Sequence, residues 1–290
     1  MSKRKQTEPR SGSDSEAVRE RRRSALWPAL GWSTVACSLL LLLGFVWALR
    51  DTWHPSAGLA LSQPSAPPVA TGGGWADKPQ LLVAALGDSL TRGTGDETGD
   101  GYVKAAVNSL QKTLGKPVKL INNLAVNGLT AAQLVDRLDQ KGFQESIAQA
   151  DLVLMTIGGN DLFQIAQNGG SVAFGGDVSP ELLKEKLPGA EPLLDRIFAK
   201  LRKINPYARI VYVGLYNPFY DVTAARSISE TVLEWNDYAH RLATADGNMT
   251  VVPTYDLFES NGTAYLSSDH FHPNDKGYQR IAVRIVQALQ

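Results

Sequence analysis

The sequence predicts an α/β fold in which helices cover both faces of a parallel β-sheet, preceded by one apolar N-terminal helix. Two observations predict it. In residues 79–290, called the body below, short apolar runs alternate with segments of helical periodicity, the pattern of parallel strands buried on both faces. Residues 24–49 carry no charged side chain, and this stretch is long enough for a helix across roughly 30 Å of hydrocarbon.

The first half of the body predicts three strands and two helices. The run LLVAAL at 81–86 is a short apolar strand, and residues 101–115 have helical spacing that ends at a glycine. Residues 118–126 are a second strand, and residues 130–138 return to helical spacing. Residues 151–159 complete this half as a third strand.

The middle of the body predicts a long helix and a fourth strand. Helical spacing extends from about residue 179 to residue 205 and is interrupted at Pro188. Proline removes a backbone donor and clashes with the preceding turn, so we expect the helix to break there. The apolar run at 208–217 then predicts the fourth strand.

The end of the body predicts two helices around a fifth strand. Residues 227–245 open with Ser227 and, three residues later, Glu230, the pattern of a capping box. Residues 249–258 are a weaker strand, and residues 274–289 are a final helix. In a parallel sheet of this kind, ligands bind beyond the carboxyl ends of the strands, where the strand order reverses. Functional side chains should therefore directly follow strands.

Composition and charge exclude several classes of function. The 290 residues are 43% hydrophobic and have zero net charge. Residues 1–23 hold eight Lys and Arg against four acids, or +4, which leaves −4 for the rest of the chain. A mildly acidic body argues against a nucleic-acid partner, because phosphate binding needs a basic face. Cys37 is the single cysteine, so neither an intramolecular disulfide nor a Cys/His zinc cluster can form.

The N-terminal region predicts a single-pass membrane anchor. Residues 1–23 are basic and precede the apolar segment 24–49, so the positive-inside rule places the N-terminus in the cytoplasm. Residues 50–78 are rich in Pro, Ser, Ala and Gly and predict a disordered tether to the domain at 79–290, outside a bacterial-type plasma membrane. A cleaved signal peptide, with secretion, and a buried core helix are the alternatives. The residues that follow the apolar run form a poor cleavage site.

The first candidate for chemistry is Ser89, in the motif GDSLTRG at 87–93. It follows the first strand and precedes a helix, so its hydroxyl can be exposed and its backbone N–H can serve as an oxyanion donor. Alternatively, the motif is a turn that only caps a helix. A phosphate-binding loop is a further alternative, but neither glycine-rich phosphate motif is present, and the neighbouring acids would repel phosphate.

Two further clusters follow the second and third strands. In NLAVNGLT at 123–130, Gly128 could bring its N–H close to a ligand. In GGND at 158–161, the side-chain amide of Asn160 could donate to a developing oxyanion. Taken separately, each cluster is as well explained by an ordinary turn.

The fourth cluster, SSDHFHPND at 267–275, contains the candidate base. Asp269 can accept from the imidazole of His272 and leave the other ring nitrogen free to take a serine proton. His270 is the rival base, but in an extended segment it would point away from the face of Asp269. A metal site made of Asp269, His270, His272 and Asp275 is another alternative, although no further histidine lies nearby in the sequence.

Together the four clusters resemble the GDSL/SGNH hydrolase family, named after Ser, Gly, Asn and His in four separate blocks. The matching residues here are Ser89, Gly128, Asn160 and His272, with Asp269, and the resemblance covers about residues 80–290. It implies a flavodoxin-like three-layer sandwich with a five-stranded parallel sheet. It also implies hydrolysis of acyl esters without a metal or organic cofactor, and it is nearest to bacterial lysophospholipase- and lipase-like members.

The resemblance predicts Ser89, His272 and Asp269 as a catalytic triad, and Ser89, Gly128 and Asn160 as an oxyanion hole. The expected substrate is a small-molecule or lipid acyl ester, such as a lysophospholipid, and the ectodomain is expected to be monomeric. An acyltransferase or deacetylase acting on envelope polysaccharide would share every one of these residues. A non-catalytic binding module on the same fold is the alternative from another class.

The segment 162–190 follows Asn160 and is expected to border the pocket. Its apolar side chains could line an acyl groove or belong to the core, and the core is the better interpretation. They are Leu162, Phe163, Ile165 and Phe174.

Overall fold

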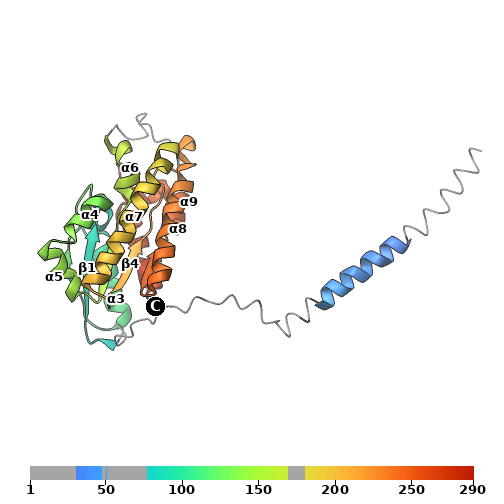
Figure 1. Ribbon diagram of the computed structural model, residues 1–290, viewed down its shortest axis with the longest axis horizontal. Coiled ribbons are helices and arrows are strands. Elements are labelled where there is room, and N and C mark those ends of the chain that lie inside the picture. Colours follow the sequence, from blue (N-terminus) through green and yellow to red (C-terminus); the bar gives the residue numbers. More distant parts are fainter. Residues whose placement is uncertain (1–30, 48–49, 51–76, 169–179) are drawn as a thin grey trace, which may run out of the picture. The chain divides into compact units, whose positions relative to one another are not determined.

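The computed structural model describes residues 31–47, 50, 77–168 and 180–290, with the backbone alone for 164–168 (Figure 1). The chain divides into two units, Met1–Pro64 and Ser65–Gln290, and each is described by itself. In the first unit, residues 31–47 form a helix. Within the described ranges, every helix lacks either the length or the apolar character needed to cross a membrane. The predicted anchor at 24–49 extends beyond the described helix at both ends, so it stays a prediction.

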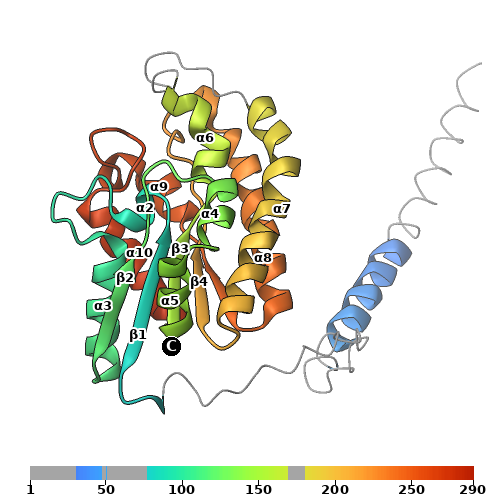
Figure 2. The same ribbon diagram turned by 60° about the vertical axis from the view of Figure 1, so that its left-hand side comes forward.

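The second unit is built on a five-stranded parallel sheet (Figure 2). Its strand order is β2-β1-β3-β4-β5, so the chain reverses direction across the sheet between β1 and β3. The strands are β1 (Leu81–Gly87), β2 (Val118–Asn123), β3 (Leu152–Thr156), β4 (Arg209–Val213) and β5 (Met249–Val252). This is the flavodoxin-like order, and it confirms the predicted α/β fold and five parallel strands.

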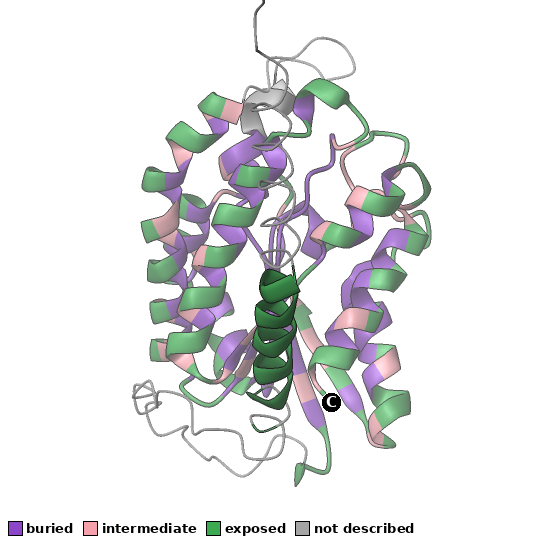
Figure 3. Cartoon of the chain, turned by 90° about the vertical axis from the view of Figure 1, so that its right-hand side faces the viewer, coloured by how far each residue is buried: buried purple, intermediate pink, exposed green. Residues whose placement is uncertain are grey.

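Helices cover both faces of the sheet and bury alternate strand residues. Val83 and Ala85 of β1 pack with the helices α3 (Gly101–Leu114), α9 (Tyr255–Tyr265) and α10 (Asp275–Ala288). Ala84 and Leu86 pack on the opposite face. The helices of that face are α4 (Ala131–Arg137), α5 (Lys141–Gln149), α6 (Gly159–Asn168), α7 (Pro180–Ile204) and α8 (Ile228–Asp246). Figure 3 shows the strands as largely buried, whereas the helices of this unit carry both buried and exposed residues.

Several strands are shorter than their apolar runs predicted. β2 ends at Asn123 rather than at residue 126, and β3 ends at Thr156 rather than at residue 159. The apolar residues that follow lie in loops at the end of the sheet, where Ala125 and Ile157 are buried and Leu124 and Val126 are partly buried. Residues 249–258 were also predicted as one strand, but β5 ends at Val252 and α9 begins at Tyr255. Pro253 lies between them and has no N–H to continue the ladder.

The predicted break at Pro188 is wrong, because α7 is a single helix with Pro188 and Pro192 inside it. Each interior proline costs about 3 kcal/mol. Burying one leucine contributes roughly 1.5–3 kcal/mol, and α7 buries a whole apolar face that outweighs this cost. The buried residues of that face include Leu183, Leu187, Leu194, Ile197 and Leu201.

The predicted capping box of α8 is also wrong, because Ser227 makes no side-chain capping bond. Ser227 adopts helical backbone angles, in which its hydroxyl does not reach the first turn. A complete capping box is found instead at the start of α4, between Thr130 and Gln133. Helices α5, α6 and α9 were not predicted.

Candidate active site

The turn after β1 presents Ser89 at the carboxyl edge of the sheet. Gly87 has φ of 133°, and a Cβ there would lie 2.0 Å from the carbonyl oxygen of Thr156, so this position requires glycine. Asp88 then caps the four-residue helix α2 (Ser89–Arg92) by accepting from the N–H of Leu90. The capping turn and the exposed nucleophile were alternatives in the sequence, and the structure contains the cap with Ser89 as the first helical residue.

The loop before α10 is closed on itself. Leu266 and Pro273 form an antiparallel bridge, and the N–H of Ser267 donates to the carbonyl of His272 at 2.8 Å. Asn274 caps α10, and its side-chain amide donates to the carbonyls of Ala264 and Leu266. These bonds hold Asp269 and His272 on one short, fixed turn.

Ser89, His272 and Asp269 meet in a continuous chain of hydrogen bonds. The Oγ of Ser89 lies 2.8 Å from Nε2 of His272, and Nδ1 of His272 lies 2.6 Å from Oδ2 of Asp269. Ser89 is buried, and the His272 side chain is 14% exposed. The hydroxyl can therefore pass its proton to Nε2 while Nδ1–H stays bound to the carboxylate.

The charge of Asp269 is stabilised by several donors. Its Oδ1 accepts from the N–H groups of Phe271 and His272, both at 2.9 Å, and from the hydroxyl of Ser267 at 2.7 Å. Partial burial alone would raise the pKa of Asp269. The side-chain bond with His272 and these other bonds outweigh the burial and lower the pKa well below its ordinary value. Asp269 is therefore a carboxylate at neutral pH.

His270 lies in the same loop but is not bonded to Ser89. The segment is a turn and not the extended strand that was assumed, and His270 has φ of 53°. The preference for His272 over His270 therefore agrees with the structure, although the reason given for it was wrong. Among the described residues, no group of three or more His, Cys, Asp or Glu side chains is arranged to hold a metal ion. The alternative metal site at Asp269, His270, His272 and Asp275 is therefore not assembled.

Gly128 lies on the loop that follows β2, and Asn160 lies in the first turn of α6, just after β3. Gly128 has φ of 75°, and a Cβ there would meet nothing within 4 Å. Its N–H has no hydrogen-bond partner in the described part of the chain. Asn160 is buried near the start of α6, and its Nδ2 donates to the carbonyl of Leu129 at 2.9 Å. One N–H of each residue thus remains available to a ligand.

Comparison with known proteins identifies the family of this chain. The sequence profile of the GDSL-like lipase/acylhydrolase family matches residues 85–280. The uncharacterized protein YpmR of Bacillus subtilis (strain 168) is 34% identical over 73% of this chain and 83% of its own length. The chain belongs to the GDSL-like lipase/acylhydrolase family. It is a serine ester hydrolase of the GDSL type.

Two further relatives extend the comparison to named lipases. The spore germination lipase LipC of Bacillus licheniformis is 26% identical to this GDSL hydrolase over 71% of the chain and 94% of its own length. The solved structure of the lipase Lip_vut3 from a goat rumen metagenome superposes with a TM-score of 0.62 and is 26% identical. It covers 72% of this chain and 97% of its own.

A buried chain of hydroxyl groups supports the turn that carries Ser89 in this GDSL hydrolase. Thr156 donates to Oδ1 of Asp88 at 2.6 Å, and Thr91 lies 2.7 Å from both Thr156 and Tyr102. Burial raises the pKa of Asp88, and the bonds from Thr156 and Leu90 offset part of that effect. Oδ2 of Asp88 has no partner among the described residues. This network is not predictable from the sequence, because residue type alone does not indicate which side chain a buried threonine will contact.

An aromatic cluster lies behind the imidazole. The ring of Phe271 meets the ring of His272 edge to face, with centroids 5.0 Å apart, and also packs against Phe163 and Phe219. Tyr216 donates its hydroxyl to the carbonyl of Phe271 at 2.7 Å. Leu162 and Phe163 are buried in the core, in agreement with the better interpretation of segment 162–190. Phe174 and the side chain of Ile165 lie outside the described residues.

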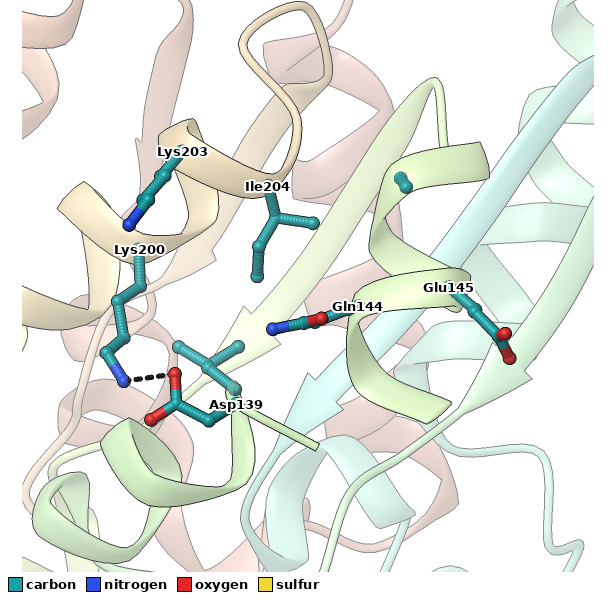
Figure 4. A pocket seen from close by; sticks show the side chains of 8 residues that line it. Asp139, Gln144, Glu145, Lys200, Lys203 and Ile204 are labelled. Atoms are coloured by element: carbon teal, nitrogen blue, oxygen red, sulfur yellow. Dashed lines mark hydrogen bonds and ion pairs between the residues drawn. The ribbon is translucent and has the colours of Figure 1, made fainter. Parts of the chain in front are cut away.

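Ser89 lines neither of two surface cavities in this unit. The first, of about 470 Å³, is bordered by Asp139, Gln144, Lys200 and Ile204 (Figure 4), at the ends of α5 and α7 that lead into strands. It therefore lies at the amino edge of the sheet. The second, of about 640 Å³, is acidic and lies between the loop at Asp96 and the outer side of Asp269.

Proposed function

We propose that this GDSL hydrolase cleaves carboxylic acyl esters with Ser89 as nucleophile, His272 as base and Asp269 as the group that orients the imidazole. The observation that carries the proposal is the chain of contacts at 2.8 Å and 2.6 Å that joins these three side chains. Asp269 fixes the tautomer in which Nδ1 carries the proton, and so leaves Nε2 free to accept one.

In the first half of the reaction, His272 takes the proton of Ser89 while Oγ attacks the ester carbonyl carbon. The carbonyl electrons move to the oxygen, and the tetrahedral oxyanion forms. When the intermediate collapses, the bond to the leaving alcohol breaks, and the alcohol takes the proton from His272. Water then attacks the acyl-enzyme with His272 again as base. Ser89 leaves as the hydroxyl, and the carboxylic acid is released.

We propose that the N–H groups of Ser89 and Gly128 and the amide of Asn160 bind the oxyanion. The N–H of Ser89 belongs to the first residue of α2 and has no acceptor within the helix. The free N–H of Gly128 and the second amide hydrogen of Asn160 add two further donors. Because all of these groups come from one chain, we propose that the catalytic domain acts as a monomer.

The substrate that we propose is a lipid acyl ester, with a lysophospholipid as the first candidate. The lipase names of two relatives support it. We also propose that residues 24–49 anchor the chain in a bacterial-type plasma membrane and that residues 50–78 tether the domain on its outer side. This placement would bring the domain close to membrane lipids.

The variant Ser89→Ala tests the proposal. It removes the nucleophile but keeps the small side chain that the turn requires, so we expect the fold to remain and ester hydrolysis and fluorophosphonate labelling to be lost. Circular dichroism checks the fold of the same sample. Labelling that persists in the folded variant would exclude Ser89. A series of acyl esters and lysophospholipids of increasing chain length then decides the substrate class by kcat/KM.

A further inference from the structure

Two consecutive residues of α6 hold the loop that carries Gly128. Nδ2 of Asn160 donates to the carbonyl of Leu129 at 2.9 Å. The N–H of Ala131 donates to the carboxylate of Asp161, at 3.0 Å from Oδ1 and 2.9 Å from Oδ2. Gly128 directly precedes this bonded segment. The loop after β2 is therefore bound on both sides of Thr130 to the start of a helix that follows β3.

The surroundings of the hydrogen bond from the Ala131 N–H to the Asp161 carboxylate favour a strong bond. Leu129 and Ala131 are both buried, so water does not compete for their backbone groups. Ala131 is the first residue of α4, where an N–H has no partner within the helix and the helix dipole favours a negative charge. The pKa of Asp161 is raised, mainly by burial and further by the nearby Asp88, while the bond from Ala131 and the charge of Lys186 oppose part of that effect.

We propose that Asp161 is a positioning residue that holds the Gly128 N–H and the Asn160 amide at the spacing required by the oxyanion. This inference rests on the proposed function, because it assumes that both groups bind the oxyanion. Asn160 uses one amide hydrogen on Leu129, so the direction of the other follows the position of that carbonyl. Asp161 binds the N–H of Ala131, on the other side of Thr130, and so holds the same loop at a second point.

The loss of Asp161 would act on the transition state more than on the bound substrate. The buried N–H of Ala131 would lose its acceptor, and the loop could shift relative to α6. A shift of about 1 Å in a catalytic group can cost on the order of 100-fold in rate. The ground-state carbonyl depends less on these donors than the oxyanion does, so kcat should fall and KM should change little.

The experiment compares Asp161→Ala with the unchanged protein, both as the full chain. A short-chain p-nitrophenyl ester gives kcat and KM, and an alkyl boronic acid, which forms a tetrahedral adduct on a nucleophilic serine, gives Ki. We expect kcat to fall about tenfold or more, KM to change less than about twofold, and Ki for the boronic acid to rise with the loss in kcat/KM. Asp161→Asn retains an acceptor oxygen and should recover most of kcat.

Asp151→Ala is the matched control. Its carboxylate likewise accepts from a backbone N–H, that of Leu82 at 2.9 Å, but at the amino edge of the sheet. We expect this variant to lose stability and to keep kcat per folded molecule. If Asp161→Ala does not fold, Asp161→Ser replaces it, because serine keeps a polar side chain at this position but is shorter than the carboxylate that accepts from Ala131.

Two outcomes would overturn the inference: an unchanged kcat and Ki in the folded Asp161 variant, or an equal fall in kcat in Asp151→Ala. Failure of the proposed function is recognised separately. Activity that persists in Ser89→Ala would reject the nucleophile, whereas an inactive Ser89→Ala with an unaffected Asp161 variant would reject the positioning role alone.

Discussion

At the scale of single residues, the surroundings of two carboxyl groups in the site shift their pKa values in opposite directions. Asp269 is 45% exposed and surrounded by donors, and these bonds lower its pKa. Asp88 is buried with one oxygen unpartnered, and burial raises its pKa. The two groups should therefore affect stability in opposite directions as the pH changes.

The pH dependence of stability tests this contrast. The stabilisation from Asp269 is complete above its ordinary pKa of 3.8 and is lost as the pH falls through the lower folded-state value. The difference in urea midpoint between the unchanged protein and Asp269→Asn should therefore be largest at neutral pH and shrink below pH 3.8. For Asp88→Asn the trend should reverse, because ionising a buried carboxyl costs stability as the pH rises. The same trend in both variants would contradict the assignment.

At the scale of elements, loops that approach each other closely position the imidazole. Gly95 has φ of 93°, and a Cβ there would lie 2.6 Å from the carbonyl oxygen of Pro273 and 2.9 Å from Cβ of His272. The loop after α2 therefore packs directly against the turn that carries His272, with no room for a side chain at Gly95. Gly99, in the same loop, also has positive φ, but a Cβ there would meet nothing within 4 Å.

The pair Gly95→Ala and Gly99→Ala separates backbone strain from displacement of His272. Both variants place an alanine at positive φ, which should cost about 1–2 kcal/mol of unfolding free energy, and Gly95→Ala should lose more because its Cβ also meets Pro273 and His272. Only Gly95→Ala should also lower kcat, because its methyl group pushes the turn with His272 away from Ser89. Equal kcat values in the two variants, measured on folded protein, would show that this contact does not position the base.

At the scale of the whole molecule, every group proposed for catalysis lies in the second unit. Five residues come from loops and helix starts at one edge of a single sheet: Ser89, Gly128, Asn160, Asp269 and His272. The ion pair of Lys78 with Asp151 joins the start of this unit to the region just before β3.

A chain of residues 77–290 should therefore fold and hydrolyse soluble esters with the kcat/KM of the full chain. Thermal unfolding and p-nitrophenyl ester turnover check this expectation. If residues 24–49 are the anchor, the full chain should sediment with membranes and the shortened chain should not. A large loss of turnover in the shortened chain would show that the N-terminal region contributes to the site.

The sequence alone was sufficient for the fold class and for the residues proposed for the site. Apolar runs reveal buried parallel strands because both faces are covered, and short motifs such as GDSL and GGND mark the loops at their ends. Element boundaries were less predictable. The apolar residues after β2 and β3 pack wholly or partly out of water in loops and not in strands. Helix α7 continues through Pro188 because its packed face outweighs the cost of the proline.

Only the tertiary structure decided which groups meet. Ser89 and His272 are 183 residues apart in the sequence, and the bond between them depends on the strand order and on the turn before α10. The partners of Asp88, Asp161 and Gly95 were equally hidden, because a residue's type does not indicate what will pack against it. The local pattern of apolar and polar residues determined most of the helices and strands of this hydrolase, and its short motifs marked the candidate site residues. The long-range contacts that position its candidate site follow from burying both faces of one sheet.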